Sequence, residues 1–407
     1  MSQKVHIHME VGGKLHFVGR LWFHKGRDRG SATFEYDRAW LNFSDAFALD
    51  PALPLIVGQY HTGPGQELFG CFRDCSPDRW GRTLMQRSER AKAKTEKRTA
   101  RTLQAGDFLL LVSDLSRQGA IRITDPDDTV FFTTAESGIP TAIKLGDLLS
   151  AARHIAAKTE SAEDLKLLFG PCASLGGARP KAMIQDASGR LFIAKFPKDG
   201  DEWDVPLWEA VSLTLAREAG IETPNVELRL IQGKNVLLVE RFDRVKERRI
   251  PFASAMTLLG MNDGDRGSYL DIADILNREG AETKKDLAQL WQRMVFNFLT
   301  SNVDDHLRNH GFLRYATGWK LSPVYDLETT PPEVAPRELH TVMDPYDSTS
   351  SIDKAIEISE HFGLTKQQAK ALARKTGEAT SRWQRVARAF GASAHDLDSM
   401  QDAFLKL

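Results

Sequence analysis

The sequence of 407 residues contains only three cysteines, Cys71, Cys75 and Cys172. Three is an odd number, and the gap between Cys71 and Cys75 is not the two-residue gap of a zinc knuckle or a redox motif. With only His61 nearby as a further ligand, a metal site at this pair is disfavoured. We therefore expect reduced thiols that serve packing.

The sequence also lacks long apolar runs and an excess of charge of either sign. No segment approaches the ~18 apolar residues that span a bilayer, and the N-terminus has no apolar core of signal-peptide type. The formal net charge of -1 gives no global attraction to nucleic acid. With 42% hydrophobic residues, the chain is expected to be a cytoplasmic protein of two or three globular domains.

Two regions are rich in predicted strands. Alternating apolar residues on both sides of Gly12 and Gly13 predict a hairpin at the N-terminus, with His6 and His8 on a solvated face of an edge strand. In residues 180–243, two further hairpins flank a helix over 206–219, which Pro206 begins and Gly220 ends. Strand, strand, helix, strand, strand is the order of a kinase-like small lobe.

A basic segment lies between these regions. The Ser76-Pro77-Asp78 sequence predicts a helix start, and residues 82–101 then carry eight basic and two acidic residues. A solvated helix face explains such a run. Contact with nucleic acid or an acidic partner is the alternative, and no aromatic residues interleave with the charges to support it.

Helical spacing dominates after residue 243, and its clearest case precedes a cluster of polar residues. Leu287, Leu290, Trp291, Met294 and Phe298 form one apolar stripe, typical of a buried helix. The ten residues that follow at 303–312, "VDDHLRNHGF", contain two aspartates, two histidines and an asparagine. A buried helix would hold these groups rigidly.

Three of the polar residues in this half of the chain match the order of a kinase active site. Asn309 lies five residues after Asp304, the spacing of the base and the metal-binding asparagine of a kinase catalytic loop, and Asp326 follows as a second Mg²⁺ ligand. Upstream, Lys195 ends an apolar strand and would need phosphates or Glu209 as counter-charge. A zinc site at His306 and His310 is the disfavoured alternative, because Asn309 and Gly311 oppose a helix there.

Several motifs in this order resemble the HipA family of serine/threonine protein kinases, the toxins of bacterial HipBA toxin–antitoxin modules. The segments "FRDCSPDRWGR" and "GDFLLLVSDLSRQGAIR" resemble the N-terminal region of that family, and "SLGGARPKAMI" resembles its glycine-containing loop. The segments "AKFP", "LLVERFDR", "VDDHLRNHGF" and "LSPVYDL" resemble its kinase core. The resemblance extends over nearly the whole chain.

The resemblance implies a set of site residues. Asp304 would be the catalytic base, supported by Asp305 and His306, and Asn309 and Asp326 would bind Mg²⁺. ATP would be held by the glycine-containing loop, by the phosphate-binding lysine and by a hinge segment, which together comprise Ser174, Leu175, Gly176, Gly177, Ala178, Arg179, Lys181, Lys195, Glu240, Phe242 and Asp243. Ser174 also matches the serine that members autophosphorylate.

The implied fold is α+β, a protein-kinase-like bilobal fold with a β-rich N-terminal region, a β-rich small lobe and an all-helical C-terminal lobe. We expect an N-terminal subdomain over 1–125, the small lobe over 126–246 and the helical lobe over 247–407. The implied activity is phosphorylation of a protein serine, with an aminoacyl-tRNA synthetase as the implied target. The implied partners are a HipB-like helix-turn-helix antitoxin and, through it, operator DNA. A catalytically silent nucleotide-binding corepressor is the alternative.

Overall fold

The computed structural model describes residues 3–26, 30–127, 130–132, 139–169 and 177–407. Internal contacts group the chain into two compact units, Met1–Asp199 with Asp243–Ala253, and Gly200–Phe242 with Ser254–Leu407. Each unit is mixed α and β, as expected for an α+β chain. The three-part domain division stays a prediction.

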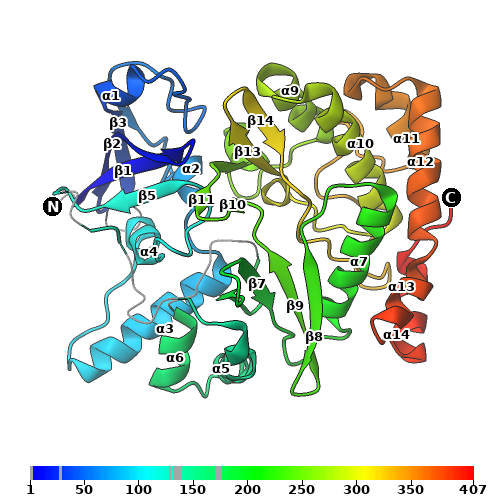
Figure 1. The fold of residues 1–407 in the computed structure, drawn as a ribbon, viewed down its shortest axis with the longest axis horizontal. Helices are drawn as coiled ribbons and strands as arrows, with labels where there is room; N and C mark the ends of the chain where they lie inside the picture. The colour runs from blue at the N-terminus through cyan, green and yellow to red at the C-terminus, as the bar shows by residue number, and fades with distance from the viewer. Residues whose placement is uncertain (1–2, 27–29, 128–129, 133–138, 170–176) are drawn as a thin grey trace. The chain divides into compact units, whose positions relative to one another are not determined.

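An antiparallel five-stranded sheet in the order β4-β3-β2-β1-β5 forms the start of the first unit (Figure 1). Its strands are β1 (Gln3–Val11), β2 (Lys14–His24), β3 (Ser31–Tyr36), β4 (Gln59–His61) and β5 (Ile121–Thr124). The predicted hairpin is confirmed, because Gly12 and Gly13 turn the chain between β1 and β2 with φ of 59° and 79°.

The prediction of an edge strand with solvated histidines is wrong. Strand β1 pairs with β5 as well as with β2, so it lies inside the sheet. His6 and His8 are each only 8% exposed, and the His8 ring nitrogen Nε2 lies 3.1 Å from the Thr124 hydroxyl on β5. The histidines face a covered side of the sheet.

The first unit contains short and long helices, and the predicted helix start at Ser76-Pro77-Asp78 is confirmed for one of them. The helices are α1 (Arg38–Leu41), α2 (Gly70–Asp74), α3 (Arg79–Thr95), α4 (Ala105–Leu111), α5 (Leu145–Ala157) and α6 (Ala162–Phe169). Asp78 begins α3 by accepting a hydrogen bond from the Gly81 N–H at 2.8 Å, as a capping aspartate does. The basic run of residues 82–101, on α3 and just after it, is partly neutralised, since Arg98 pairs with both Glu89 and Glu96, whereas Arg90 is exposed.

Cys71 and Cys75 are buried free thiols in the first unit. Burial raises the pKa of Cys75 to about 11 and raises the pKa of Cys71 as well. Both therefore remain protonated at neutral pH and serve packing. Cys172 lies outside the described residues.

The predicted strand, strand, helix, strand, strand order is present along the chain. Strands β6 (Lys181–Gln185) and β7 (Leu191–Lys195) form a hairpin in the first unit, and β8 (Val226–Ile231) and β9 (Lys234–Glu240) form one in the second. Helix α7 (Val205–Ala219) lies between them in sequence. Its predicted ends are confirmed, with Pro206 in the first turn and Gly220 closing the helix at φ of 92°.

The rest of the second unit is largely helical. Its helices are α8 (Ala255–Leu258), α9 (Tyr269–Glu279), α10 (Thr283–Leu299), α11 (Ile352–Glu357), α12 (Lys366–Thr380), α13 (Trp383–Ala389) and α14 (Ala394–Ser399). The expected all-helical lobe is nevertheless incorrect, because β13 (Gly311–Tyr315) and β14 (Gly318–Leu321) form a hairpin directly after the polar cluster. In the part of the chain that the structure describes, no helix meets the length and apolarity needed to cross a bilayer.

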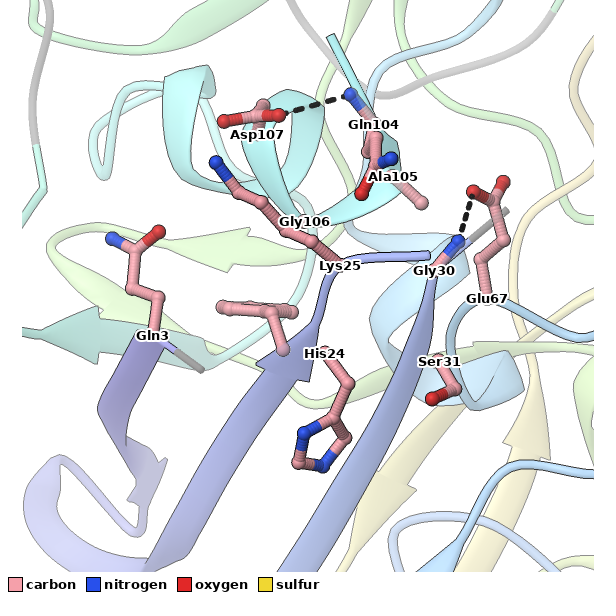
Figure 2. A pocket seen from close by; sticks show the side chains of 11 residues that line it. Gln3, His24, Lys25, Gly30, Ser31, Glu67, Gln104, Ala105, Gly106 and Asp107 are labelled. Carbon is pink, nitrogen blue, oxygen red and sulfur yellow. Dashed lines mark hydrogen bonds between the residues drawn. The ribbon is translucent and has the colours of Figure 1, made fainter. Parts of the chain in front are cut away.

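A small pocket opens beside the end of β2 in the first unit (Figure 2). The Gly30 N–H donates to Glu67 and the Gln104 N–H donates to Asp107 at its wall. Its volume of ≈ 20 Å³ is room for about one water molecule, far below the ~300 Å³ at which ligand pockets begin. This pocket is too small for a nucleotide.

Candidate active site

The polar cluster of residues 303–312 follows α10, a largely buried helix of the second unit. Leu290, Trp291 and Met294 of α10 are fully buried, and the Trp291 indole N–H donates to the Ala355 carbonyl at 2.8 Å. The predicted apolar stripe is therefore confirmed. Past the helix end, the Asn302 N–H donates to the Asn297 carbonyl, and the Asn302 side chain donates to the Asn297 side chain. The loop thus starts from a fixed point.

Two adjacent aspartates in this loop have opposite environments. Asp304 is exposed, whereas Asp305 is only 1% exposed. The Asp305 carboxylate accepts hydrogen bonds from the Tyr269 hydroxyl at 2.7 Å and from the Thr341 N–H at 3.2 Å. Its backbone carbonyl accepts a further bond from the Thr341 hydroxyl at 2.6 Å. Asp305 therefore positions the loop from within, and Asp304 is the carboxylate that a substrate can reach.

Burial raises the pKa of Asp305 to about 8, although its hydrogen-bond donors oppose the shift. The folded protein then retains a proton that the unfolded chain releases near pH 4. We expect the free energy of unfolding to fall as pH rises from about 4 to about 8, by up to ~1.4 kcal/mol per pH unit from this group, and to level off above that range. Urea unfolding of the wild type and Asp305→Asn across this range tests it, and equal slopes for the two proteins would contradict the assignment.

Asn309 presents an oxygen that has no partner within the described part of the chain. It lies in a short 3-10 turn, η2 (Leu307–Asn309), and its side-chain N–H donates to the Asp304 backbone carbonyl at 2.8 Å. This bond directs the amide oxygen Oδ1 the other way, where it is buried without a hydrogen bond. A buried amide oxygen without a donor fits a hard cation such as Mg²⁺, which prefers oxygen ligands.

Asp326 is held in an unusual backbone conformation five residues after β14. Its φ is 53°, in the left-handed region that a non-glycine residue enters at an energetic cost. The preceding Tyr325 fixes this position, since its hydroxyl donates to the Arg308 carbonyl at 2.6 Å. The Tyr325 bond thus ties the Asp326 segment to the turn that carries Asn309. Two oxygen ligands, Asn309 and Asp326, are therefore presented by linked segments.

The histidines of the cluster have distinct surroundings. His310 is 3% exposed, its ring meets Tyr269 edge to face, and burial lowers its pKa to about 3. It is a neutral structural residue. His306 is half-buried, and its ring lies 6.1 Å from that of His340. Among the residues described, no group of three or more His, Cys, Asp or Glu side chains is placed to hold a metal.

The predicted hinge residues fall into both units. In the second unit, the Glu240 N–H donates to the Asn225 carbonyl at 2.9 Å, and the Phe242 ring packs 5.5 Å from the Tyr325 ring. In the first unit, Asp243 is 1% exposed, and its carboxylate accepts hydrogen bonds from the Gly119 N–H and from Arg244. Asp243 thus secures the chain after the hinge, and a direct nucleotide contact is not open to its carboxylate.

The glycine-containing loop is described from Gly177 onward. Ser174, Leu175 and Gly176 lie outside the described residues. Gly177 and Ala178 are exposed and Arg179 is half-buried, as is Lys195 at the end of β7.

Lys181 lies directly across the hairpin from Lys195, so the two lysines share one face. The Lys181 side chain is 4% exposed and its ammonium pairs with Asp78 at 2.8 Å, although a phosphate contact was predicted for it. This pairing makes Lys181 an anchor of the loop, and it lowers the repulsion that two adjacent ammonium groups would otherwise feel.

Replacing Lys181 with methionine should destabilise the protein. The substitution leaves the largely buried Asp78 carboxylate without its cation, which costs about 3 kcal/mol of unfolding free energy. Asp78→Asn combined with Lys181→Met should recover part of that loss, because no uncompensated charge then remains. Urea unfolding checks the cycle, with the exposed Lys94→Met on α3 as the control. A double variant no more stable than Lys181→Met would contradict the pairing.

The structure therefore brings together Asp304, Asn309, Asp326 and Phe242 in the second unit and places Lys181 and Lys195 in the first. Sequence reasoning missed Tyr269 and Thr341, which each lie 36 residues from Asp305. It also missed the packing of Tyr325 on Phe242. Nothing in the local sequence around Tyr269 or Thr341 signals these contacts, because only the folded chain brings them to the loop.

Known proteins resemble this chain in both sequence and structure. Residues 173–384 match the family model described as HipA-like C-terminal domain, and residues 9–107 match the HipA N-terminal domain. A protein of Sinorhizobium fredii, Y4mE, whose name describes it as a kinase, is 26% identical over 364 residues, which cover 78% of each chain. The serine/threonine-protein kinase toxin HipA of Shewanella oneidensis is 27% identical over 197 residues, 39% of this chain and 43% of that protein.

One solved structure supports the same fold over the full length. It is a Shewanella oneidensis toxin–antitoxin complex of HipA, HipB and operator DNA. The matched chain has a TM-score of 0.62 at 17% identity, over 98% of this chain and 94% of its own length.

Proposed function

The chain belongs to the HipA-like family, and we propose that it is an ATP-dependent protein kinase that phosphorylates serine or threonine. The observation that carries the proposal is the presence in one loop of an exposed carboxylate, Asp304, and of a buried amide oxygen on Asn309 that accepts no hydrogen bond from the described residues. The Asp304 carboxylate can accept a proton from a substrate hydroxyl, and the Asn309 oxygen can bind a cation. Both are fixed in a loop that buried contacts of Asp305 hold rigidly.

In the proposed reaction, Asp304 takes the proton of a serine hydroxyl while the serine oxygen forms a bond to the γ-phosphorus of ATP. The bond from that phosphorus to the bridging oxygen breaks, and ADP leaves with the electron pair. Asn309 and Asp326 would hold Mg²⁺, which supplies positive charge against the phosphates. Lys195 would contribute a second positive charge. Glu240 and Phe242 would form the adenine side, and Tyr325 fixes the Phe242 ring in place.

The proposed nucleotide site differs from the predicted one in two residues, Lys181 and Asp243, and Asp305, predicted as a support of the catalytic base, keeps a supporting role. Lys181, Asp243 and Asp305 are buried, and their polar side-chain groups bond to other parts of the protein. They are proposed as positioning residues for the glycine-containing loop, the hinge and the catalytic loop. Gly177, Ala178 and Arg179 remain proposed phosphate neighbours, together with Ser174, Leu175 and Gly176.

A toxin acting on translation is the proposed biological role. A curated relative is named a serine/threonine-protein kinase toxin, and the family resemblance supplies an aminoacyl-tRNA synthetase as the proposed target class. Mass spectrometry of purified synthetases after incubation with the protein, ATP and Mg²⁺ tests this. Addition of one phosphoryl group to a serine of one synthetase supports the target class, whereas a lysate in which other proteins are labelled and synthetases are not rejects it.

Autophosphorylation at Ser174 is proposed as the means of shutting the enzyme down. A phosphoserine would add ~1.5 to 2 negative charges beside the phosphates of ATP, which disfavours nucleotide binding. Ser174→Ala should therefore remain active after prolonged incubation with ATP.

A HipB-like antitoxin and operator DNA are the proposed partners, on the strength of the Shewanella oneidensis complex. Exposed basic residues of α3 and the C-terminal helices, such as Arg90 and Arg374, are the proposed DNA neighbours. Neutralising them should make the salt dependence of DNA binding by the antitoxin complex less steep. An unchanged slope would remove these helices from the interface.

A further inference from the structure

A tight turn follows the catalytic loop in the second unit and carries a tyrosine at its tip. Tyr346 is 95% exposed, among the most exposed large side chains of the described chain. The turn spans residues 344–347, and the Asp347 N–H donates to the Asp344 carbonyl at 3.2 Å across it. The Asp344 carboxylate also accepts a bond from the Tyr346 N–H at 2.9 Å. With Pro345 at its second position, the backbone of the turn is well defined.

Side-chain contacts hold this turn from below. Lys354 of α11 reaches Asp344 at 3.0 Å and Asp347 at 3.2 Å, and its ammonium-bearing side chain is only 10% exposed. Helix α11 is itself fixed to α10 by the bond from Trp291 to the Ala355 carbonyl. Tyr346 therefore projects from a turn whose backbone is held in place. A tyrosine on a fixed backbone has only two side-chain torsions to order, so it supplies contact area at low entropic cost, which is why tyrosine is frequent at binding surfaces.

The turn is connected to the catalytic loop through a short segment. Thr341 bonds to both the backbone carbonyl and the carboxylate of Asp305, next to Asp304. Val342 pairs with the residues that begin α9, donating to the Gly267 carbonyl and accepting from the Tyr269 N–H. Tyr346 is five positions after Thr341 in the chain, a span of at most about 18 Å. Because Thr341 bonds to the neighbour of Asp304, an extended peptide that presents a hydroxyl to Asp304 needs about five to seven residues to reach Tyr346.

The charge around the tip identifies the chemistry of its partner. Residues 344–357 contain four acidic residues and one basic residue, a net charge of -3. The partly exposed Asp347 and the exposed Asp353 and Glu357 lie on this segment with Tyr346. A basic segment complements such a surface, and its long side chains can also lie over the tyrosine ring.

We propose that the turn around Tyr346 is a docking surface for a basic segment of the protein substrate, several residues away from the phosphorylated serine. This inference rests on the proposed kinase function and adds a preference for arginine or lysine at a distance from the acceptor. Tyr346 acts in substrate binding and not in the transfer step. Its loss should therefore raise the KM for the peptide and leave kcat and the KM for ATP unchanged.

Synthetic peptides of about fifteen residues with a central serine test the proposal. One set carries two arginines between five and seven residues from the serine, and a matched set carries glutamates there. Binding to the full-length protein is measured by fluorescence anisotropy with a non-hydrolysable ATP analogue, and transfer is measured with labelled ATP. We expect the arginine set to bind at least about tenfold more tightly than the glutamate set. Tyr346→Ala should reduce arginine-set binding by about tenfold, and Tyr346→Phe should retain most of it.

The control variant is Tyr315→Ala, which removes another exposed tyrosine of the second unit, at the end of β13. It should bind the arginine set as the wild type does. Equal binding of the two peptide sets, or equal binding by the wild type and Tyr346→Ala, would overturn the docking surface. Loss of antitoxin binding by Tyr346→Ala without a change for the peptides would assign the turn to another partner and overturn it too. If arginine peptides bind through Tyr346 but no phosphate is transferred to any protein, the proposed kinase function fails while the docking surface stands.

Discussion

Asp304→Asn should lower phosphoryl transfer by about 10²- to 10⁴-fold, the contribution that a positioned general base makes. Asparagine has the shape of aspartate but cannot take the proton of the acceptor hydroxyl. The loop should keep its conformation, because Asn309 bonds to the backbone carbonyl of Asp304 and not to its carboxylate. The affinity for ATP and the melting temperature should therefore stay at wild-type values.

Single-turnover transfer from labelled ATP measures this effect, and thermal unfolding of the same samples checks the fold. Asp263→Asn is the matched control. Asp263 is another exposed carboxylate bound to this loop, through an ion pair with Arg308 at 2.9 Å, and it has no proposed part in the chemistry. Equal rates for Asp304→Asn and the wild type would remove Asp304 as the base. Equal losses in Asp304→Asn and Asp263→Asn would indicate a disturbed loop.

Asp326→Gly should separate activity from stability. Glycine adopts a φ of 53° without the cost that aspartate bears there, which favours the variant by up to ~1 kcal/mol and offsets stability lost with the side chain, so the free energy of unfolding should change far less than the activity. It lacks the carboxylate proposed to hold Mg²⁺, so transfer should fall by about 10³-fold, an effect of several kcal/mol on the barrier. Such a result would mean that Asp326 lowers the stability of the fold through its backbone conformation and provides a Mg²⁺ ligand for the reaction.

Asp326→Asn provides the matched comparison, because asparagine tolerates the left-handed region and keeps one neutral oxygen ligand. Its transfer rate should lie between those of the wild type and Asp326→Gly, and more Mg²⁺ should be needed to reach half of its maximal rate. Urea unfolding and Mg²⁺ titration of the rate measure the two effects. Wild-type Mg²⁺ dependence in both variants would show that Asp326 is no metal ligand.

Local signals in the sequence account for the elements that carry the site. The apolar stripe predicted the buried helix α10, and the Asp78 cap and the Gly220 turn predicted helix ends that the structure places within one residue. These features depend on neighbours three or four residues apart, which a linear reading captures. The five-residue spacing of Asp304 and Asn309 is local in the same sense, and it placed both residues in one loop.

Contacts between distant residues account for what the sequence could not predict. Asp78 lies 103 residues before Lys181, so the burial of that lysine against a carboxylate had no local sign. The sequence alone does not distinguish Asp304 from its neighbour Asp305. Asp305 is identified as the buried aspartate that fixes the loop only by its hydrogen bonds from Tyr269 and Thr341. Likewise, the local pattern around His8 predicts a solvated side chain on an edge strand. Strand β5, which pairs with the second edge of β1, lies more than a hundred residues further along the chain.

The position of the label transferred from ATP tests the central claim most directly. The wild-type protein is incubated with Mg²⁺ and a cell lysate in parallel with γ-labelled and α-labelled ATP, and protein-bound label is assigned to residues by mass spectrometry. The proposed chemistry at Asp304, Asn309 and Asp326 predicts label on protein serine or threonine from γ-labelled ATP and none from α-labelled ATP. Label from α-labelled ATP, or no labelled protein with either, would contradict a phosphoryl-transfer site.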